Sequence, residues 1–273
     1  MIATQEYGWT QLADRAGLRW PDAADWAMAQ AAAAGFDAWE PLVHGPDDLR
    51  RVAETAGRHG LAMPSIFLSG PLGGAEAGAT LDRMRATLRA AGAMGCRLAS
   101  VYPSPDASGW KPDAALVAQA RNLGALAQAA RGEGVQVLYH PEEGCLHHGA
   151  REMAHMLLAT DPDEVGLCLD PDTVWRASGG SMVAVLDVLR SWGARVAEVH
   201  LRQCRAGVWT EALGPGDVDF AAVAGALRAA GARPFVAVEH AFEEGTVVTL
   251  DPVEAHRRSL RYVEDAFLPA LDG

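Results

Sequence analysis

Short apolar segments alternate with longer segments of helical periodicity along the whole chain. Eight apolar segments are predicted to be strands: Ile2–Glu6, Phe36–Glu40, Leu61–Leu68, Arg97–Tyr102, Gly134–Glu142, Val165–Asp170, Ala194–Arg202 and Pro234–Glu239. The segments between and after them are predicted to be helices: Pro21–Ala34, Pro46–His59, Ala79–Met94, Pro112–Arg131, Ala150–Leu158, Ser181–Trp192, Phe220–Ala230 and Pro252–Phe267. This regular alternation predicts an α/β fold with a parallel sheet.

A glycine marks the join between a helix and the next strand at six places: Gly35, Gly60, Gly95, Gly134, Gly193 and Gly231. Glycine just past a helix end allows the left-handed backbone that reverses the chain. No linker rich in Pro or Ser divides the chain, and no Gly-x-Gly-x-x-Gly motif follows a strand. A barrel needs roughly 250 residues, so we expect residues 1–273 to form one domain, a single (β/α)8 TIM barrel.

Composition excludes some partners. Apolar residues make up 49% of the chain and charged residues 21%, which is typical of a globular protein. The formal net charge is −12, Lys111 is the only lysine, and no basic stripe is present. A nucleic-acid partner is therefore not expected, because such proteins neutralise phosphates with clustered cations. The acidic balance favours a small-molecule ligand.

Four widely separated cysteines form no metal-binding or disulfide pattern, which favours a reducing, cytoplasmic setting: Cys96, Cys145, Cys168 and Cys204. We expect no signal peptide, because no basic region followed by an apolar stretch opens the chain. No apolar run reaches the roughly 18 residues of a membrane span. A homodimer or homotetramer is compatible with a barrel of this size, since such barrels often pair through their helices.

Four predicted strands end on side chains that can bind a metal ion. Asp170 ends one strand, Glu239 another, and His200 lies near the end of a third. The strand before them delivers both His140 and Glu142. Because parallel strands all end on one face of a barrel, these groups are predicted to hold one divalent cation. Glu142 as the fourth ligand favours Mn²⁺, Co²⁺ or Mg²⁺, whereas His140 favours Zn²⁺, Fe²⁺ or Co²⁺.

Other polar residues are predicted to surround the same opening. Glu40 and Tyr102 end two further strands and either bind substrate or form hydrogen bonds at the rim. Arg202 shares a strand face with Glu198, so it either holds a substrate oxygen or pairs with that acid. His256 falls on a predicted helix and is expected at the surface.

Four segments carry a resemblance to a known family: Leu167-Cys-Leu-Asp170, Val199-His-Leu-Arg202, Gly214-Pro-Gly-Asp-Val-Asp-Phe220 and Val236-Ala-Val-Glu239. They resemble the xylose isomerase-like TIM-barrel superfamily, the sugar phosphate isomerase/epimerase group, over nearly the whole chain. Members include ketose 3-epimerases, hydroxypyruvate isomerases and inosose dehydratases. The resemblance implies that Asp170, His200 and Glu239 bind one divalent metal.

The chain departs from the family pattern at two points. The family usually has Glu followed by a polar pair where this chain has His140-Pro-Glu142. The family also often has a histidine just after the aspartate of the sixth strand, where this chain has Asp172 and Thr173. The first departure leaves His140 and Glu142 as alternative ligands, and the second indicates a different substrate or a weakened catalyst.

The expected activity is rearrangement of a small polyhydroxy carbonyl compound in carbohydrate metabolism, by isomerisation, epimerisation or dehydration. In this hypothesis the metal stabilises an enediolate. Glu142 and Glu239 act as the acid/base pair, while Arg202, Tyr102 and Glu40 contact the substrate. One alternative is a metal-dependent hydrolase or phosphodiesterase of the endonuclease IV type, which should need more histidines and a basic groove. Another is a catalytically weakened barrel that only binds a sugar.

Overall fold

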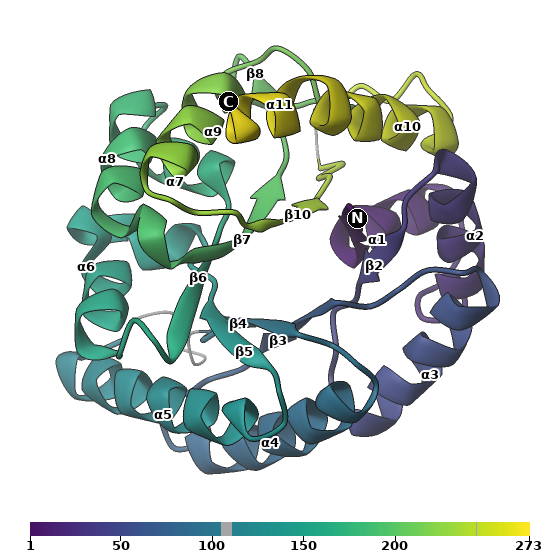
Figure 1. Ribbon diagram of the computed structural model, residues 1–273. Helices are drawn as coiled ribbons and strands as arrows, with labels where there is room; N and C mark the ends of the chain where they lie inside the picture. The colour runs from purple at the N-terminus through teal and green to yellow at the C-terminus, as the bar shows by residue number, and fades with distance from the viewer. Residues whose placement is uncertain (105–110, 244) are drawn as a thin grey trace.

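Eight parallel strands form the centre of the computed structural model, which describes residues 1–104, 111–243 and 245–273. They are β1 (Ala3–Gln5), β2 (Ala38–Glu40), β3 (Ser65–Ser69), β4 (Leu98–Tyr102), β5 (Gln136–Tyr139), β6 (Val165–Leu169), β7 (Val196–Leu201) and β10 (Phe235–Val238). The order in the sheet is β2-β1-β10-β7-β6-β5-β4-β3. Two bridges, Ala38 with Ala62 and Leu42 with Phe67, bring its two edges together. The predicted single TIM barrel is confirmed (Figure 1).

The helices lie outside the strands as a ring (Figure 1). The eight that follow the predicted pattern are α2 (Ala24–Ala34), α3 (Pro46–Arg58), α4 (Ala77–Ala93), α5 (Asp113–Arg131), α6 (Glu143–Ala159), α8 (Met182–Trp192), α9 (Phe220–Ala229) and α10 (Pro252–Tyr262). Helix α6 begins earlier than predicted and contains a kink at residues 147–150. After α10 the chain continues through the π-helical segment η2 (Val263–Phe267) into α11 (Leu268–Asp272). No described helix has both the length and the hydropathy that crossing a membrane requires.

Besides the terminal α11, two short helices and one hairpin were not predicted. Helix α1 (Glu6–Arg15) follows β1 directly, and α7 (Pro171–Ala177) follows β6 directly. Each begins without a loop because a side chain at the strand end caps it, Gln5 for α1 and Asp170 for α7. The hairpin of β8 (Cys204–Arg205) and β9 (Val208–Trp209) lies between β7 and α9.

The glycine joins behave as predicted except at one position. Gly35 has φ of 103° and ends α2 in the left-handed region that favours glycine. Gly193 has φ of −56° instead and continues from α8 into the 3₁₀ segment η1 (Gly193–Arg195). The prediction of a left-handed reversal at Gly193 is therefore wrong, because the chain tightens its helix there rather than reversing.

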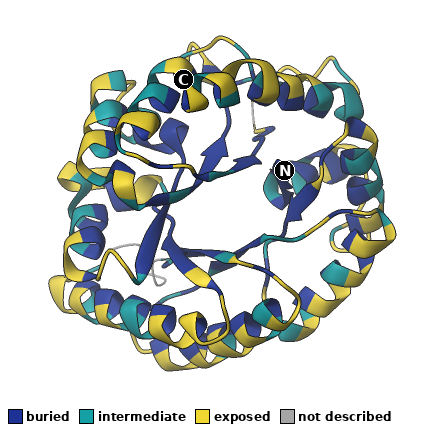
Figure 2. Ribbon diagram, viewed as in Figure 1, coloured by how far each residue is buried: buried dark blue, intermediate teal, exposed yellow. Residues whose placement is uncertain are grey.

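Alternate strand residues face the helices and the barrel interior, and the strands are buried on both sides (Figure 2). Along β10, Val236 and Val238 belong to the large apolar core shared with the helices, whereas Ala237 belongs to a small interior cluster with Ala3 and Ala38. Glu239 follows Ala237 by two residues and continues on the interior side. The interior is thus closed below by alanines and lined above them by polar side chains.

The space between the barrel and α10 is apolar and contains His256. This residue is 1% exposed, and its ring stacks on Trp9 with centroids 3.9 Å apart. Phe36 contacts the same ring edge-on. The expectation of a surface position is wrong, because Trp9 of α1 and Phe36, which precedes β2, cover that face of α10.

Candidate active site at the carboxyl ends of the strands

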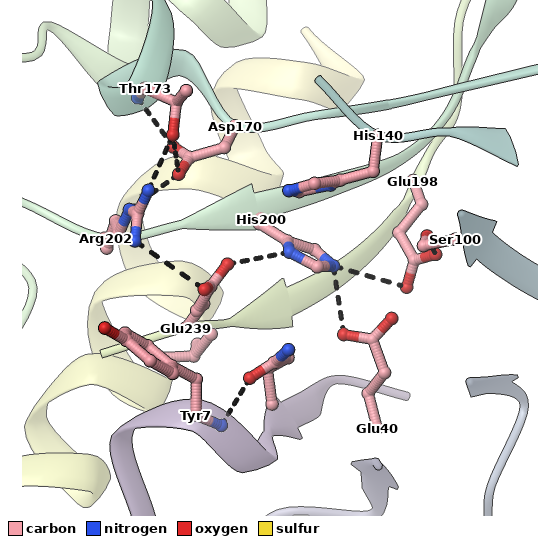
Figure 3. Close-up of polar contacts among 12 residues, drawn as sticks. Tyr7, Glu40, Ser100, His140, Asp170, Thr173, Glu198, His200, Arg202 and Glu239 are labelled. Carbon is pink, nitrogen blue, oxygen red and sulfur yellow. Dashed lines mark hydrogen bonds and ion pairs between the residues drawn. The ribbon is translucent and has the colours of Figure 1, made fainter. Parts of the chain in front are cut away.

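His200 lies at the centre of a buried polar cluster inside the barrel (Figure 3). Its Nδ1 atom lies 2.8 Å from Oε2 of Glu239, and its Nε2 atom lies 3.0 Å from Oε2 of Glu40. Oε1 of Glu198 lies 3.9 Å from the same Nε2 atom. The ring of His140 lies alongside, with centroids 5.0 Å apart. All five side chains are buried, so each charge depends on its neighbours rather than on water.

Asp170 directly follows β6, and both of its carboxylate oxygens are bound by local partners. Its Oδ1 atom accepts hydrogen bonds from the backbone N–H groups of Asp172 and Thr173, at 2.8 and 3.3 Å. Its Oδ2 atom accepts from the Thr173 hydroxyl at 2.8 Å and lies 2.6 Å from Nε of Arg202. The same carboxylate therefore caps α7 and holds an arginine.

Arg202 follows the last residue of β7 and places its guanidinium among the acids. Nη2 donates to the hydroxyl of Thr173 at 2.6 Å, and Nη1 lies 3.6 Å from Oε1 of Glu239. The guanidinium carbon lies 4.7 Å from the centre of the Trp209 ring, a cation–π contact. Arg202 is 9% exposed, so its charge is neutralised by these acids rather than by solvent.

The electrostatic setting fixes the charges of the central groups. Burial opposes ionisation of Glu239, but Arg202 and His200 outweigh it and lower the pKa of that carboxyl to about 2. Burial likewise opposes the charge of His200, but Cys168, Glu40 and Glu239 raise its pKa well above the usual range. Glu239 is therefore ionised and His200 protonated near neutral pH.

The end of β5 contributes a second pair of opposite charges. Nε2 of His140 lies 3.6 Å from Oε1 of Glu142. Burial opposes the charge of His140, but Cys168 and Glu142 raise its pKa to about 10. Burial opposes ionisation of Glu142 as well, yet His140 lowers its pKa. This pair is thus an ion pair with the histidine below and the acid at the opening.

A cavity of about 330 Å³ opens above this cluster. Its polar lining includes side chains from four separate strand ends: Tyr102, Glu142, Arg202 and Glu239. Aromatic rings form part of its wall, namely Tyr7, Phe67 and Trp209. The volume and the mixed lining suit a small polar molecule whose oxygen atoms meet charged groups and whose carbon atoms meet rings.

The residues predicted for the site lie at one end of the barrel but at two depths. Tyr102, Glu142, Arg202 and Glu239 line the cavity. Glu40 is fully buried beside His200 and Ser65, outside the cavity lining, so it touches the site through the histidine.

Two buried groups were not assigned to the site from the sequence. Cys168 lies in the apolar strand β6, and its sulfur lies close enough to His140 and His200 to form a ligand group with them. Glu198 was considered only as a partner of Arg202, and this pairing is wrong, because Glu198 accepts hydrogen bonds from Ser65 and Ser100. The available signal was strand alternation, which places Cys168 of β6 and Glu198 of β7 on the inner face of the barrel.

The structure contains groups that could hold a metal ion, but the predicted ligands are not arranged as one of them. Among the described residues, three donor atoms lie within 4.8 Å of one another in His140–Cys168–His200 and in Glu40–Glu198–His200. Asp170 and Glu239 instead face the guanidinium of Arg202. In this side-chain arrangement the predicted ligands do not fit an ion, because Asp170 and Glu239 offer it no open donor atoms. Metal binding itself stays a prediction.

The chain is similar in fold to solved sugar epimerases. L-ribulose 3-epimerase is 17% identical, with a TM-score of 0.73 over 98% of this chain and 95% of that one. The D-allulose 3-epimerase from Methylomonas sp. in complex with D-allulose is 17% identical, with a TM-score of 0.70 over 97% and 96%. The 3-keto-D-glucoside 4-epimerase from E. coli is 18% identical, with a TM-score of 0.69 over 97% and 99%. No curated protein matches the sequence.

The sequence also matches a family description directly. The model of the xylose isomerase-like TIM barrel matches residues 28–266, which is most of the chain. This match agrees with the barrel topology and with the resemblance carried by the ends of β6, β7 and β10. The chain therefore belongs to the xylose isomerase-like TIM-barrel family.

Proposed function

We propose that the protein is an isomerase or epimerase of a small sugar, keto-sugar or inosose. The observation that carries this proposal is that two ionised carboxylates, Glu142 and Glu239, line one cavity from the ends of different strands. The guanidinium of Arg202 lines the same cavity. Similarity to epimerases of L-ribulose, D-allulose and a 3-keto-D-glucoside supports a polyhydroxy carbonyl substrate.

The chemistry follows from the charges of these groups. One carboxylate takes a proton from the carbon next to the substrate carbonyl, and the electron pair of that C–H bond forms an enediolate. In an isomerisation the hydroxyl proton moves to the former carbonyl oxygen, and the same carboxyl group returns its proton to the neighbouring carbon. In an epimerisation the second carboxylate first takes up a proton from water and delivers it to the other face of the first carbon, while the first carboxyl group releases its proton to water. Tyr102 and Arg202 orient the substrate oxygens in the cavity.

The divalent ion implied by the family resemblance, with Mn²⁺, Co²⁺ or Mg²⁺ favoured over Zn²⁺ or Fe²⁺, takes no part in these steps. The predicted ligands Asp170 and Glu239 face Arg202 instead. A titration of chelator-treated protein with each ion, followed by stability and turnover, tests that prediction directly.

Proton exchange provides the test of the proposed activity. Purified protein is incubated in D₂O with a panel of ketoses and inososes, and deuterium uptake next to the carbonyl is followed by NMR together with product formation. We expect exchange and conversion with at least one substrate, and loss of both in Glu142→Gln and Glu239→Gln. Sugar binding without any exchange by the folded wild-type protein would refute the proposal and favour a sugar-binding barrel.

A further inference from the structure

The guanidinium of Arg202 lies against the predicted metal ligands Asp170 and Glu239, and it lines the same cavity as Glu142. Its charge interacts most strongly with Asp170 and Glu239, followed by Glu142 and Asp172. Nε lies 2.6 Å from the Asp170 carboxylate, and Nη1 lies on the side of Glu239. A side chain that is 9% exposed and surrounded by acids has the position and charge of a structural cation.

Each of the three carboxylates already has a basic neighbour. Asp170 lies against Arg202, Glu239 lies 2.8 Å from Nδ1 of His200, and Glu142 lies 3.6 Å from Nε2 of His140. Both Asp170 oxygens accept further hydrogen bonds from α7. A divalent ion among these carboxylates would have to displace the guanidinium and break its hydrogen bond to the Thr173 hydroxyl.

The guanidinium is also held in place from its flat side. The Trp209 ring lies 4.7 Å from its central carbon, and the hydroxyl of Thr173 accepts from Nη2 at 2.6 Å. Nη1 is 3.6 Å from Glu239, which exceeds hydrogen-bond distance, and the side chain lines the cavity. Nη1 is thus the atom available to an oxygen of a bound molecule.

We propose that Arg202 is the resident cation of this site and takes the place of a divalent ion among Asp170, Glu239 and Glu142. Its guanidinium neutralises the acids, and Nη1 donates to a carbonyl or enediolate oxygen of the substrate. The second statement rests on the proposed function. The first concerns metal binding alone and is tested without any substrate.

The decisive experiment compares metal binding by wild-type protein and Arg202→Gln, using Mn²⁺ and Co²⁺ with calorimetry and the EPR or visible spectrum of the bound ion. Arg176→Gln is the matched control, because Arg176 also stacks on Trp209, at 4.4 Å, but its hydrogen bonds go to Cys204 and Gly207. We expect Arg202→Gln to bind one ion at least about tenfold more tightly than wild type. Arg176→Gln should behave as wild type.

A second substitution locates the gained site. Asp170→Asn in the Arg202→Gln background should abolish the added metal binding, because it removes the carboxylate that pairs with the guanidinium in the wild-type protein. One equivalent of Mn²⁺ bound by wild-type protein as tightly as by Arg202→Gln, or no gain in the variant, would overturn the assignment.

Wild-type protein alone decides the matter if Arg202→Gln does not fold. If wild-type protein binds one equivalent of Mn²⁺ and Asp170→Asn abolishes that binding, the ion lies at the position of the guanidinium. This result would refute the inference. Wild-type protein that binds no stoichiometric Mn²⁺ or Co²⁺ supports it. Absence of turnover on sugars would count against the proposed function and leave this result unaffected.

Discussion

Two pairs of buried histidines lie on opposite sides of the barrel wall, and near neutral pH the inner pair is protonated whereas the outer pair is neutral. His140 and His200 lie inside the barrel with ring centroids 5.0 Å apart, and His240 and His256 lie between the barrel and α10 with centroids 4.6 Å apart. All four are at most 2% exposed. Burial alone lowers the pKa of a histidine, yet only the outer pair follows that rule.

The neighbours explain the difference. The inner pair faces Cys168 and several carboxylates, and the resulting attraction outweighs burial. Around the outer pair, His256 stacks on Trp9 and its Nδ1 donates to the Pro252 carbonyl oxygen, while Nε2 of His240 lies 2.9 Å from the Ser259 hydroxyl. Burial lowers the pKa of His240 to about 4 and that of His256 well below its usual range. Glu239 and His240 are consecutive, so strand alternation alone separates a charged interior from a neutral outer layer.

The largest expected effect comes from removing the acid that joins the inner pair to Arg202. Glu239→Gln keeps the shape of the side chain but removes the charge that lies 2.8 Å from His200. If Glu239 is the proposed base, turnover should fall by about 10²- to 10⁴-fold, measured as kcat/KM on the substrate found by deuterium exchange.

His256→Phe is the matched control from the outer pair, since it keeps a ring on Trp9 and lies outside the cavity. Its kcat/KM should remain close to the wild-type value. A Glu239→Gln protein with wild-type kinetics would mean that the charge of the inner cluster is structural only.

The second effect is acid destabilisation through the outer pair. A histidine with a lowered pKa is neutral in the folded protein and takes up a proton on unfolding, so stability falls as pH drops from 6.5 towards 4. For His240 the loss amounts to about 3 kcal/mol at pH 4, since each pKa unit corresponds to about 1.4 kcal/mol. Urea unfolding between pH 4 and 7 measures it.

The inner pair gives the opposite dependence and serves as the internal comparison. The pKa of His140 is raised to about 10, so its stabilising charge is fully present below pH 6.5 and lost as pH rises towards 10. His256→Phe should flatten the acid side of the stability profile and leave the alkaline side unchanged. An unchanged acid side would show that other groups control it.

The strand ends of the site could be predicted because their pattern is local. Apolar runs that stop at Asp170, His200 and Glu239 identify parallel strands and the face on which they end, and the barrel places all three there. The surroundings of Arg202 were not predictable in this way. The rule that residues two apart share a face pairs Arg202 with Glu198, but β7 ends at Leu201, so Arg202 leaves the sheet and reaches Asp170.

Contacts between distant segments account for the other differences. His256 was expected at the surface because it falls on a predicted helix, and the positions of Trp9 and Phe36 make it core. Helix α1 itself was missed because the Gln5 side chain caps it directly at the end of β1. Such contacts form only when the barrel closes, and the hydrophobic periodicity of the sequence does not predict them.

The smallest expected effect concerns Glu198, an acid next to the inner pair. It is fully buried, and its Oε2 atom accepts from the hydroxyls of Ser65 and Ser100, both at 2.8 Å. Burial, with Glu40 adding to it, raises the pKa of Glu198 well above the usual range. The folded protein therefore keeps a proton on Glu198 that the unfolded chain releases above pH 4.5, and this acid lowers stability increasingly as pH rises.

Glu198→Gln tests that assignment, because an amide has the shape and the donor of a protonated carboxyl group. We expect the variant to match wild type near pH 5 and to be more stable near pH 8, because the amide stays neutral without holding a proton, measured by urea unfolding at both values. A variant that is less stable by the same amount at both values would mean that Glu198 is ionised and pairs with His200. The inner histidines would then owe their charge to acids on both sides of the ring, and the contrast with the outer pair would be larger than we infer.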